Sequence, residues 1–435
     1  MVKIEPFRAT TINSKKQDLE GCVCPVYDTI NPDKYAEYAK CSDNVVHFTT
    51  RKSEVSVQDF IEYAEECLDK SYKDGVLIES FEPAIYIYGI RYRPMEGVLS
   101  QLPPEDRHDM YFTFGLVALV GVEELGRDSI VGHEEVFSVN TKERYQLMRR
   151  CKMNFSPILA EYNMPGHDIN NIFEEYLGFK RPNLKLSEDR MPIIDVTLDG
   201  ARHILWKVTD SDIIKRVQAL IEDEEVMILD GHHRYTASEQ LKKDDGVDST
   251  MMMLVEGGDT ALLLLPWHRS VRNCNMNLVW GKIRENFVIE TYGKESSDLI
   301  FSKLNRKEAD YTIKIGMYDG ENFYILKLAR DVVEAISEKR GEKIGMDLIV
   351  LHEWLIDPYI IGEEAEELSF SPLPSEVINN VDNKDFDVAF IMSRMDISDV
   401  ENKAHKERKS FPQKSTRFLP KVAEGIIMRR FSTDG

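Results

Sequence analysis

The hydrophobic pattern of the chain alternates between short apolar runs and segments in which apolar residues recur every three or four positions. Residues 84–88, 112–122 and 251–255 are rich in β-branched, aromatic and other apolar side chains, and they predict core strands. Residues 57–70 carry apolar side chains at helical spacing and predict an amphipathic helix. The short run 45–48 is predicted as a further strand. This mixture predicts a fold of the α/β (α+β) class.

Turn signals divide the pattern into units. Two Asp-Gly pairs, at 199–200 and 319–320, each separate two strand patterns and predict β-hairpins. A loop with adjacent prolines precedes residue 110, and a new run of strand and helix patterns begins near residue 276. We therefore expect an N-terminal α/β region at 1–110, a central unit at 111–275 and a C-terminal α/β domain at 276–435.

The most informative polar cluster follows the apolar residues 226–229, which predict a buried strand. Good helix formers follow it at 236–243. A strand, a glycine turn and a helix start together form an anion site, because backbone N–H groups point outward there and the helix dipole is positive. The cluster therefore indicates a grip on a phosphate and its metal, with a polar turn and a capping aspartate as the alternative. It comprises Asp230, Gly231, His232, His233 and Arg234.

Three further polar clusters lie near predicted strand ends, and each has a structural alternative. His133 and Glu134 suit a general base and a residue that orients it or binds phosphate, or else a solvated loop. Trp267 and Arg269 suit a small amino-acid or phosphate ligand, or else a core Trp beside a surface Arg. The last cluster is a compact cationic loop that could cradle an oxyanion or lie on the surface, and it comprises Lys414, Ser415, Thr416 and Arg417.

Charge and composition exclude several classes of function. With 55 basic and 76 acidic side chains, the net charge of −21 repels nucleic acid. The longest apolar runs, 115–122 and 261–266, are far shorter than the ~20 residues that span a bilayer, and residues 1–6 carry no apolar signal segment. The six cysteines have no paired C-x-x-C spacing, which favours reduced thiols over a zinc site. We expect a cytoplasmic monomer or homodimer with small-molecule partners and without a nucleic-acid or membrane partner.

The polar clusters resemble, in the same order, the sequence blocks of a large family of uncharacterised-domain proteins related to the free serine kinases. Residues 230–235, Asp-Gly-His-His-Arg-Tyr, resemble the family signature, and residues 25–28, Pro-Val-Tyr-Asp, resemble its N-terminal Pro-Pro-Tyr-Asp block. The blocks at 133–134, 265–269 and 412–417 also match. The resemblance covers essentially the whole chain, while the shorter archaeal kinases match best from about residue 111 onward.

The resemblance implies a ParB/sulfiredoxin-like catalytic core at 111–275, an N-terminal extension, and a C-terminal domain that contributes its basic loop to the site. The implied reaction is phosphorylation of free L-serine to O-phospho-L-serine with Mg²⁺. Pyrophosphate is the favoured donor, and ADP and ATP stay open. Glu134 would be the general base, and Asp230 would act in catalysis and hold Mg²⁺. His133, Trp267 and Arg269 would bind the substrate. The donor phosphates would be bound by Gly231, His232, His233, Arg234, Lys414, Ser415, Thr416 and Arg417.

The sequence also departs from related patterns. His232 stands where sulfiredoxins carry the reactive Cys of a Gly-Cys-His-Arg motif, so a peroxiredoxin-repair reaction would lack its nucleophile. No Gly-x-x-x-x-Gly-Lys-Ser/Thr loop is present, so the phosphate grip is not of the Walker type. Two other functions stay open, namely a nucleotide-sensing module without catalysis and a metal-dependent phosphohydrolase that uses water as the acceptor.

Overall fold

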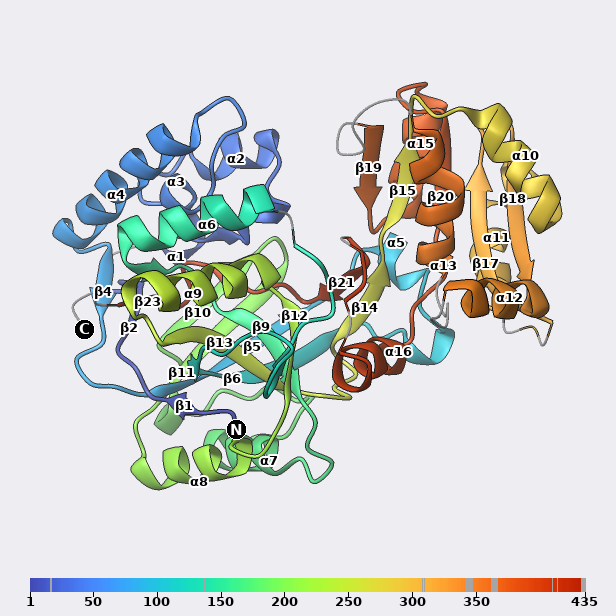
Figure 1. Cartoon of the computed structure of the whole chain (residues 1–435). Helices are drawn as coiled ribbons and strands as arrows, with labels where there is room; N and C mark the ends of the chain where they lie inside the picture. Colours follow the sequence, from blue (N-terminus) through green and yellow to red (C-terminus); the bar gives the residue numbers. More distant parts are fainter. Residues whose placement is uncertain are drawn as a thin grey trace.

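A nine-stranded mixed sheet forms the centre of the computed structural model (Figure 1). The structure describes residues 1–431 except 16–17, 137, 307, 309, 341–346, 361–366, 409 and 413. The strand order is β10-β11-β5-β6-β13-β9-β12-β7, with β1 paired to β6. The strands are β1 (Ile4–Glu5), β5 (Ile85–Tyr92), β6 (Tyr111–Gly121), β7 (Ile130–Val131), β9 (Ile158–Tyr162), β10 (Ile194–Leu198), β11 (Ala201–Val208), β12 (Val226–Asp230) and β13 (Ser249–Glu256).

Helices cover both faces of this sheet, because its strands are apolar on both sides (Figure 1). One face packs against α7 (Asp168–Leu177) and α8 (Ser211–Ile221). The other face is covered by α6 (Ser138–Cys151), α9 (His232–Asp245) and the amphipathic α4 (Val57–Lys73). Shorter helices of the first hundred residues are α1 (Leu19–Cys22), α2 (Pro32–Tyr38), α3 (Val46–Thr49) and α5 (Glu96–Leu99).

A second sheet of six antiparallel strands lies beside the first body (Figure 1). Its order is β16-β18-β17-β20-β15-β19. The strands are β15 (His268–Val271), β16 (Val288–Gly293), β17 (Tyr311–Tyr318), β18 (Asn322–Ala329), β19 (Leu368–Ser371) and β20 (Val388–Ile391). The helices of this body are α10 (Met276–Asn286), α11 (Ser297–Leu304), α12 (Arg330–Arg340), α13 (Asp347–Val350), the π-helix η5 (Leu351–Ile356) and α15 (Pro374–Asp382).

The C-terminal tail leaves the second body through α16 (Ile397–Glu401) and the π-helix η7 (Asn402–Lys406), and returns to the first. It contributes one strand to each of three small pairings. The pairings are β21 (Thr416–Leu419) with β14 (Leu263–Pro266), β22 (Ala423–Glu424) with β3 (Cys24–Pro25), and β23 (Met428–Arg430) with β2 (Ala9–Ile12) and β8 (Met153–Asn154), where β2 also pairs with β4 (Leu77–Glu79).

The mixed α/β class predicted from the sequence is confirmed. Both predicted hairpins are present, as β10–β11 and β17–β18. The strand predicted at 45–48 is wrong, because residues 46–48 lie in α3 and Val45 is the N-cap residue of that helix. Asn44 explains the difference, since its side-chain oxygen accepts the backbone N–H of Val46 at 2.8 Å, a local bond that competes with strand pairing.

The sheets do not follow the predicted domain limits. Strand β5 of the expected N-terminal region pairs along its length with β6 of the expected core, so the first sheet crosses residue 110. Strand β15, within the expected core, belongs to the second sheet. The division into independently folding domains therefore stays a prediction. Among the described residues, no helix is both long enough and apolar enough to cross a membrane.

One buried carboxyl group on the central sheet makes stability depend on pH. Glu161 on β9 is 3% exposed, and neither of its carboxylate oxygens has a hydrogen-bond partner among the described residues. Burial, and to a lesser degree the nearby charge of Glu401, raises the pKa of Glu161 to about 8. A raised pKa in an acid means that the folded state holds the proton longer than the unfolded chain, so this group lowers stability as pH rises from its unfolded value toward 8.

We expect Glu161→Gln to gain stability relative to the wild type as pH rises from about 4.5 to 8, because the amide cannot ionise. Below about pH 4.5 the difference between their free energies of unfolding should no longer change with pH. Urea unfolding midpoints at half-unit pH steps measure the difference. The exposed Glu175→Gln is the control and should show a flat difference. A flat difference for Glu161→Gln as well would mean that Glu161 is ionised normally in the folded protein.

Candidate functional site

The predicted strand–turn–helix is present. Strand β12 ends at Asp230, Gly231 adopts a left-handed conformation with φ +101°, and α9 begins at His232, four residues earlier than predicted. Gly231 is the N-cap residue and has no side chain to cap the helix, whose first N–H groups are directed at the turn. A Cβ on Gly231 would lie 2.8–2.9 Å from the guanidinium of Arg234. Both the conformation and the close approach therefore require glycine.

Asp230 lies between two cations. Its Oδ2 accepts a hydrogen bond from Arg234 Nη2 at 2.7 Å, and its Oδ1 is ion-paired with Lys421. Burial alone would raise the pKa of this carboxyl group, but Lys421 and Arg234 outweigh it and hold the pKa well below its usual range. Asp230 is therefore a permanent anion at neutral pH, with its charge largely compensated inside the protein.

Arg234 is a buried clamp rather than an exposed phosphate ligand. It is 7% exposed, and Nη1 donates to Ser156 Oγ at 2.9 Å and to the Pro157 carbonyl at 2.7 Å. With Nη2 on Asp230, the guanidinium joins β12 to the loop before β9. The sequence predicted that Arg234 binds the phosphoryl donor. In the structure, the hydrogen bonds of its guanidinium are directed inward to protein acceptors.

His133 also lies behind the site. Its Nδ1 is 2.8 Å from the Ile228 carbonyl, which can only accept, so Nδ1 carries the ring proton. Nε2 then accepts from the Thr416 hydroxyl at 2.7 Å. Burial lowers the pKa of His133 to about 4, so the ring is neutral at neutral pH. Both ring nitrogens are used within the protein, and the contact between His133 and substrate stays a prediction.

Glu134 is held by the basic loop. Its Oε1 accepts the backbone N–H of Lys414 at 3.0 Å, and its Oε2 lies 3.4 Å from the N–H of Thr416. A parallel bridge between Glu134 and Phe411 brings the two segments together. Burial raises the pKa of Glu134, while the N–H groups and the Lys414 charge oppose that rise. The result is a partly exposed carboxylate with a fixed orientation and a raised affinity for a proton.

Trp267 arranges the cations of the loop. Its Nε1 donates to the Thr416 carbonyl at 2.9 Å. The Lys414 Nζ and the Arg417 guanidinium lie 5.2 Å and 4.9 Å from the centre of the indole ring, both within cation–π range. The register between β14 and β21, which pairs Pro266 with Thr416, sets this contact (Figure 1).

Arg269 supports the same loop from the second sheet. It is 1% exposed and donates to the carbonyls of Trp267 at 2.5 Å and Lys414 at 2.8 Å. Its Nε donates to His352 Nε2 at 2.8 Å. The sequence predicted a substrate contact for Arg269, and this stays a prediction; the three hydrogen bonds above join its guanidinium to protein acceptors.

Burial separates the predicted site residues into two groups. One group is buried and makes contacts within the protein, and it comprises His133, His232, Arg234, Arg269, Ser415 and Thr416. The other is partly exposed, and it comprises Glu134, Asp230, Gly231, His233, Trp267, Lys414 and Arg417. The structure thus brings all four sequence clusters into one region, including the tail loop that is distant in sequence.

Sequence reasoning assigned no role to two charged residues of this region. Lys421 is partly exposed and pairs with Asp230. Asp28, just after β3, is exposed, and its charge acts on the pKa values of His233 and Arg417. Lys421 lies four residues after the predicted cationic loop, and only the path of the tail reveals its partner. Asp28 belongs to the block at 25–28 that resembles the family, but the sequence alone indicated no role for it.

The predicted Mg²⁺ ligand does not fit a metal in this arrangement. Both oxygens of Asp230 are paired with cations. Within the described part of the chain, no group of three or more His, Cys, Asp or Glu side chains could hold a metal ion. A divalent cation at Asp230 would have to displace Lys421, so we derive no chemical step from a protein-bound metal.

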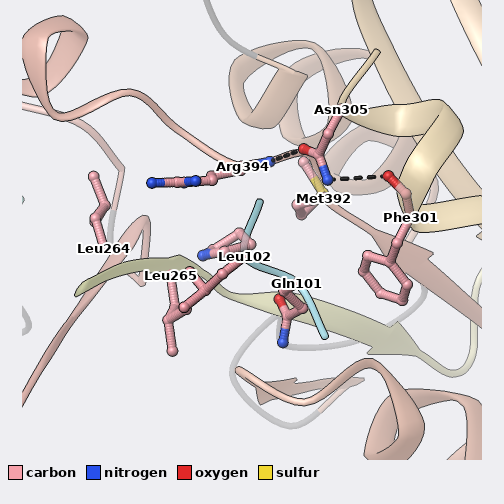
Figure 2. Close-up of a pocket in the computed structure, with 9 residues that line it drawn as sticks. Gln101, Leu102, Leu264, Leu265, Phe301, Asn305, Met392 and Arg394 are labelled. Atoms are coloured by element: carbon pink, nitrogen blue, oxygen red, sulfur yellow. Dashed lines mark hydrogen bonds between the residues drawn. The ribbon is translucent and has the colours of Figure 1, made fainter. Parts of the chain in front are cut away.

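A separate cavity lies at the junction of the two bodies (Figure 2). Leu264 and Leu265 of β14 line one side and Phe301 and Met392 of the second body line another. Figure 2 shows Asn305 accepting the backbone N–H of Arg394 at 2.9 Å. Its lining contains no carboxylate or histidine, so this cavity offers neither a general base nor an acid and is distinct from the candidate site.

Comparison with known proteins gives a family and several similar structures. A family model described as "Protein of unknown function (DUF1015)" matches residues 4–347. No curated protein matches the sequence. Similar solved structures include a conserved hypothetical protein from Pyrococcus furiosus, with 13% identity over 71% of this chain and 93% of that chain and a TM-score of 0.35. A free serine kinase in complex with AMP shares 14% identity over 69% of this chain and 93% of that chain, with a TM-score of 0.34. SbnI with C-terminal truncation from Staphylococcus aureus shares 14% over 71% of this chain and 85% of that chain, with a TM-score of 0.38.

We expect Gly231→Ala to destabilise the protein by about 1–3 kcal/mol, because it combines positive φ with a collision against Arg234. Gly246→Ala, at the other end of α9, is the matched control. It also has positive φ, at +71°, but a Cβ there meets nothing within 4 Å. Chemical unfolding of the two variants isolates the steric part. Equal destabilisation would show that Arg234 moves aside without loss.

Proposed function

The chain belongs to the family described as protein of unknown function (DUF1015), and we propose that it is a phosphotransferase that phosphorylates free L-serine to O-phospho-L-serine. The observation that carries the proposal is the Glu134 carboxylate, fixed by two backbone N–H groups of a cationic loop, while the preceding residue, His133, packs against His232 at the start of α9. A base beside a cluster of cations is what transfer of a phosphoryl group to a hydroxyl requires.

Glu134 is proposed to be the general base. The serine hydroxyl would give its proton to Glu134 as its oxygen attacks the terminal phosphorus of the donor, and the bond from that phosphorus to the leaving phosphate oxygen would break. The raised pKa of Glu134 brings its affinity for a proton closer to neutral pH, which favours proton transfer from a weakly acidic hydroxyl. The N–H groups of Lys414 and Thr416 fix the direction from which the carboxylate acts.

The phosphate groups would lie among Lys414, Arg417 and Lys421 at the N-terminus of α9. These cations are partly exposed and come from one tail segment that crosses the end of β12. The positive end of the helix dipole adds to the attraction for phosphate. This local concentration of positive charge is needed because the chain as a whole carries −21 and would repel a polyanion.

The acceptor and donor are proposed from the sequence resemblance to the free serine kinases. L-Serine is the proposed acceptor, and pyrophosphate is the favoured donor, with ADP and ATP as the alternatives. No protein ligand is proposed for Mg²⁺, since Asp230 is already paired with Arg234 and Lys421, and the concentration of Mg²⁺ is therefore varied in the assay.

The defining experiment incubates the protein with L-serine and each donor in turn, with and without Mg²⁺, and follows O-phosphoserine by ³¹P NMR. Formation of phosphoserine with one donor supports the proposal and identifies that donor. Release of inorganic phosphate without phosphoserine would instead indicate the phosphohydrolase. Binding of a nucleotide without any turnover would indicate the sensing module.

We expect Glu134→Gln to lower kcat by about 10²-fold or more while leaving the fold and donor binding intact. Glu135→Gln is the matched control, because Glu135 is exposed and its backbone N–H, rather than its side chain, donates to the Phe411 carbonyl of the tail. Its activity should be close to that of the wild type. Normal turnover in Glu134→Gln would remove Glu134 from the mechanism.

The pH dependence of kcat should report the same group. A general base is active when deprotonated, so activity should fall as pH falls through the pKa of Glu134. Because burial raises that pKa, the acid limb should lie above the ordinary glutamate value of 4.5. The limb should disappear from the residual rate of Glu134→Gln. An acid limb unchanged in that variant would belong to another residue.

A further inference from the structure

The side of Arg234 that faces away from Asp230 contacts a second buried acid. Arg234 Nη1 donates to Ser156 Oγ at 2.9 Å, and Ser156 Oγ donates to Glu424 Oε1 at 3.0 Å. Ser156 and Glu424 are 3% and 1% exposed. The hydroxyl of Ser156 has one proton, so its acceptance from Arg234 and its donation to Glu424 are mutually consistent. An ordered line of hydrogen bonds therefore runs from Glu424 to Asp230.

A small cavity lies beside this line. It is lined by polar groups from six parts of the chain, including Arg144 of α6, Arg234 of α9 and Glu424 of β22. Within the described part of the chain, the Nε atoms of Arg144 and Arg234 and the Oε2 atom of Glu424 are buried without a hydrogen-bond partner. Buried polar atoms without a partner are costly, so their presence behind Arg234 indicates a role for this cluster.

The backbone fixes Glu424 firmly. Glu424 pairs with Cys24 in the short ladder between β22 and β3. It follows Lys421, the other partner of Asp230, by three residues. The tail therefore reaches Asp230 by two routes, directly through Lys421 and indirectly through Glu424, Ser156 and Arg234. This second route is separate from every residue that faces the proposed substrates.

We propose that Glu424 is a positioning residue that holds Arg234 on Asp230 through Ser156. The inference rests on the proposed function only in that Asp230 is taken to lie at the phosphate site. If Glu424 or Ser156 is removed, the guanidinium loses a fixed acceptor on one side and no longer holds Asp230 in place. The less compensated Asp230 carboxylate then repels phosphate groups.

The hydrogen bond, rather than the charge, is the essential contribution of Glu424. Burial raises the pKa of Glu424, which favours its neutral form. A glutamine can also accept from Ser156, whereas an alanine cannot. Glu424→Gln should therefore behave like the wild type, and Glu424→Ala should not.

The test measures the affinity of the full-length protein for pyrophosphate by titration calorimetry without serine. Ser156→Ala and Glu424→Ala should each weaken binding about tenfold, and the double variant should be no weaker than the worse single one, because both act through Arg234. Thr250→Val is the control. Thr250 lines the same cavity but accepts its hydrogen bond from Ser238, so affinity should be unchanged.

Several outcomes would overturn the proposal. Effects of Ser156→Ala and Glu424→Ala that multiply in the double variant would mean that they act independently. Equal losses in Glu424→Gln and Glu424→Ala would mean that charge matters. Losses that follow the melting temperature across all variants, Thr250→Val included, would reduce Glu424 to a structural role. Pyrophosphate binding that follows the expected pattern, without phosphoserine in the kinase assay, would refute the proposed function and leave the positioning role standing.

Discussion

A charged side chain that is only 11% exposed at the end of a strand needs a compensating charge, and this constraint organises the candidate site around Asp230. The compensation comes from Arg234 on the following helix and from Lys421 on the C-terminal tail. Breaking such a contact leaves an unpaired buried charge, which is strongly destabilising. The ion pair with Lys421 that compensates the charge of Asp230 therefore also fixes the tail against the central sheet. The preceding loop of the tail carries the remaining cations, Lys414 and Arg417.

The sequence predicted local structure well where the hydrophobic period was long and clear. The amphipathic pattern at 57–70 became α4, and the apolar run before Asp230 became β12. The prediction at 45–48 failed because a four-residue apolar run fits a strand and a buried helical turn equally well, and the side chain of Asn44 decided between them. Short runs carry too little periodicity to outweigh one well-placed hydrogen bond.

The candidate site was predictable in its location and less so in its division of roles. Residue types and order were sufficient to place the four clusters together. They could not show that Arg234 and Arg269 are buried, since burial depends on which distant carbonyls and hydroxyls receive their donors. Lys421, Ser156 and Glu424 carried no local signal, because each acquires its importance from a partner more than seventy residues away.

The register between β14 and β21 has a consequence for how the second body is attached. Pro266 and Thr416 are opposite one another in an antiparallel pair, so the chain leaves and re-enters the first body at nearly the same point. A segment with its ends joined in this way is an insertion, and loop-closure entropy rises only slowly with the length of such a segment. The second body could therefore vary in size among proteins built on this plan without altering the first sheet. The two connecting segments are less free to vary, because they carry Trp267 and Lys414 of the candidate site.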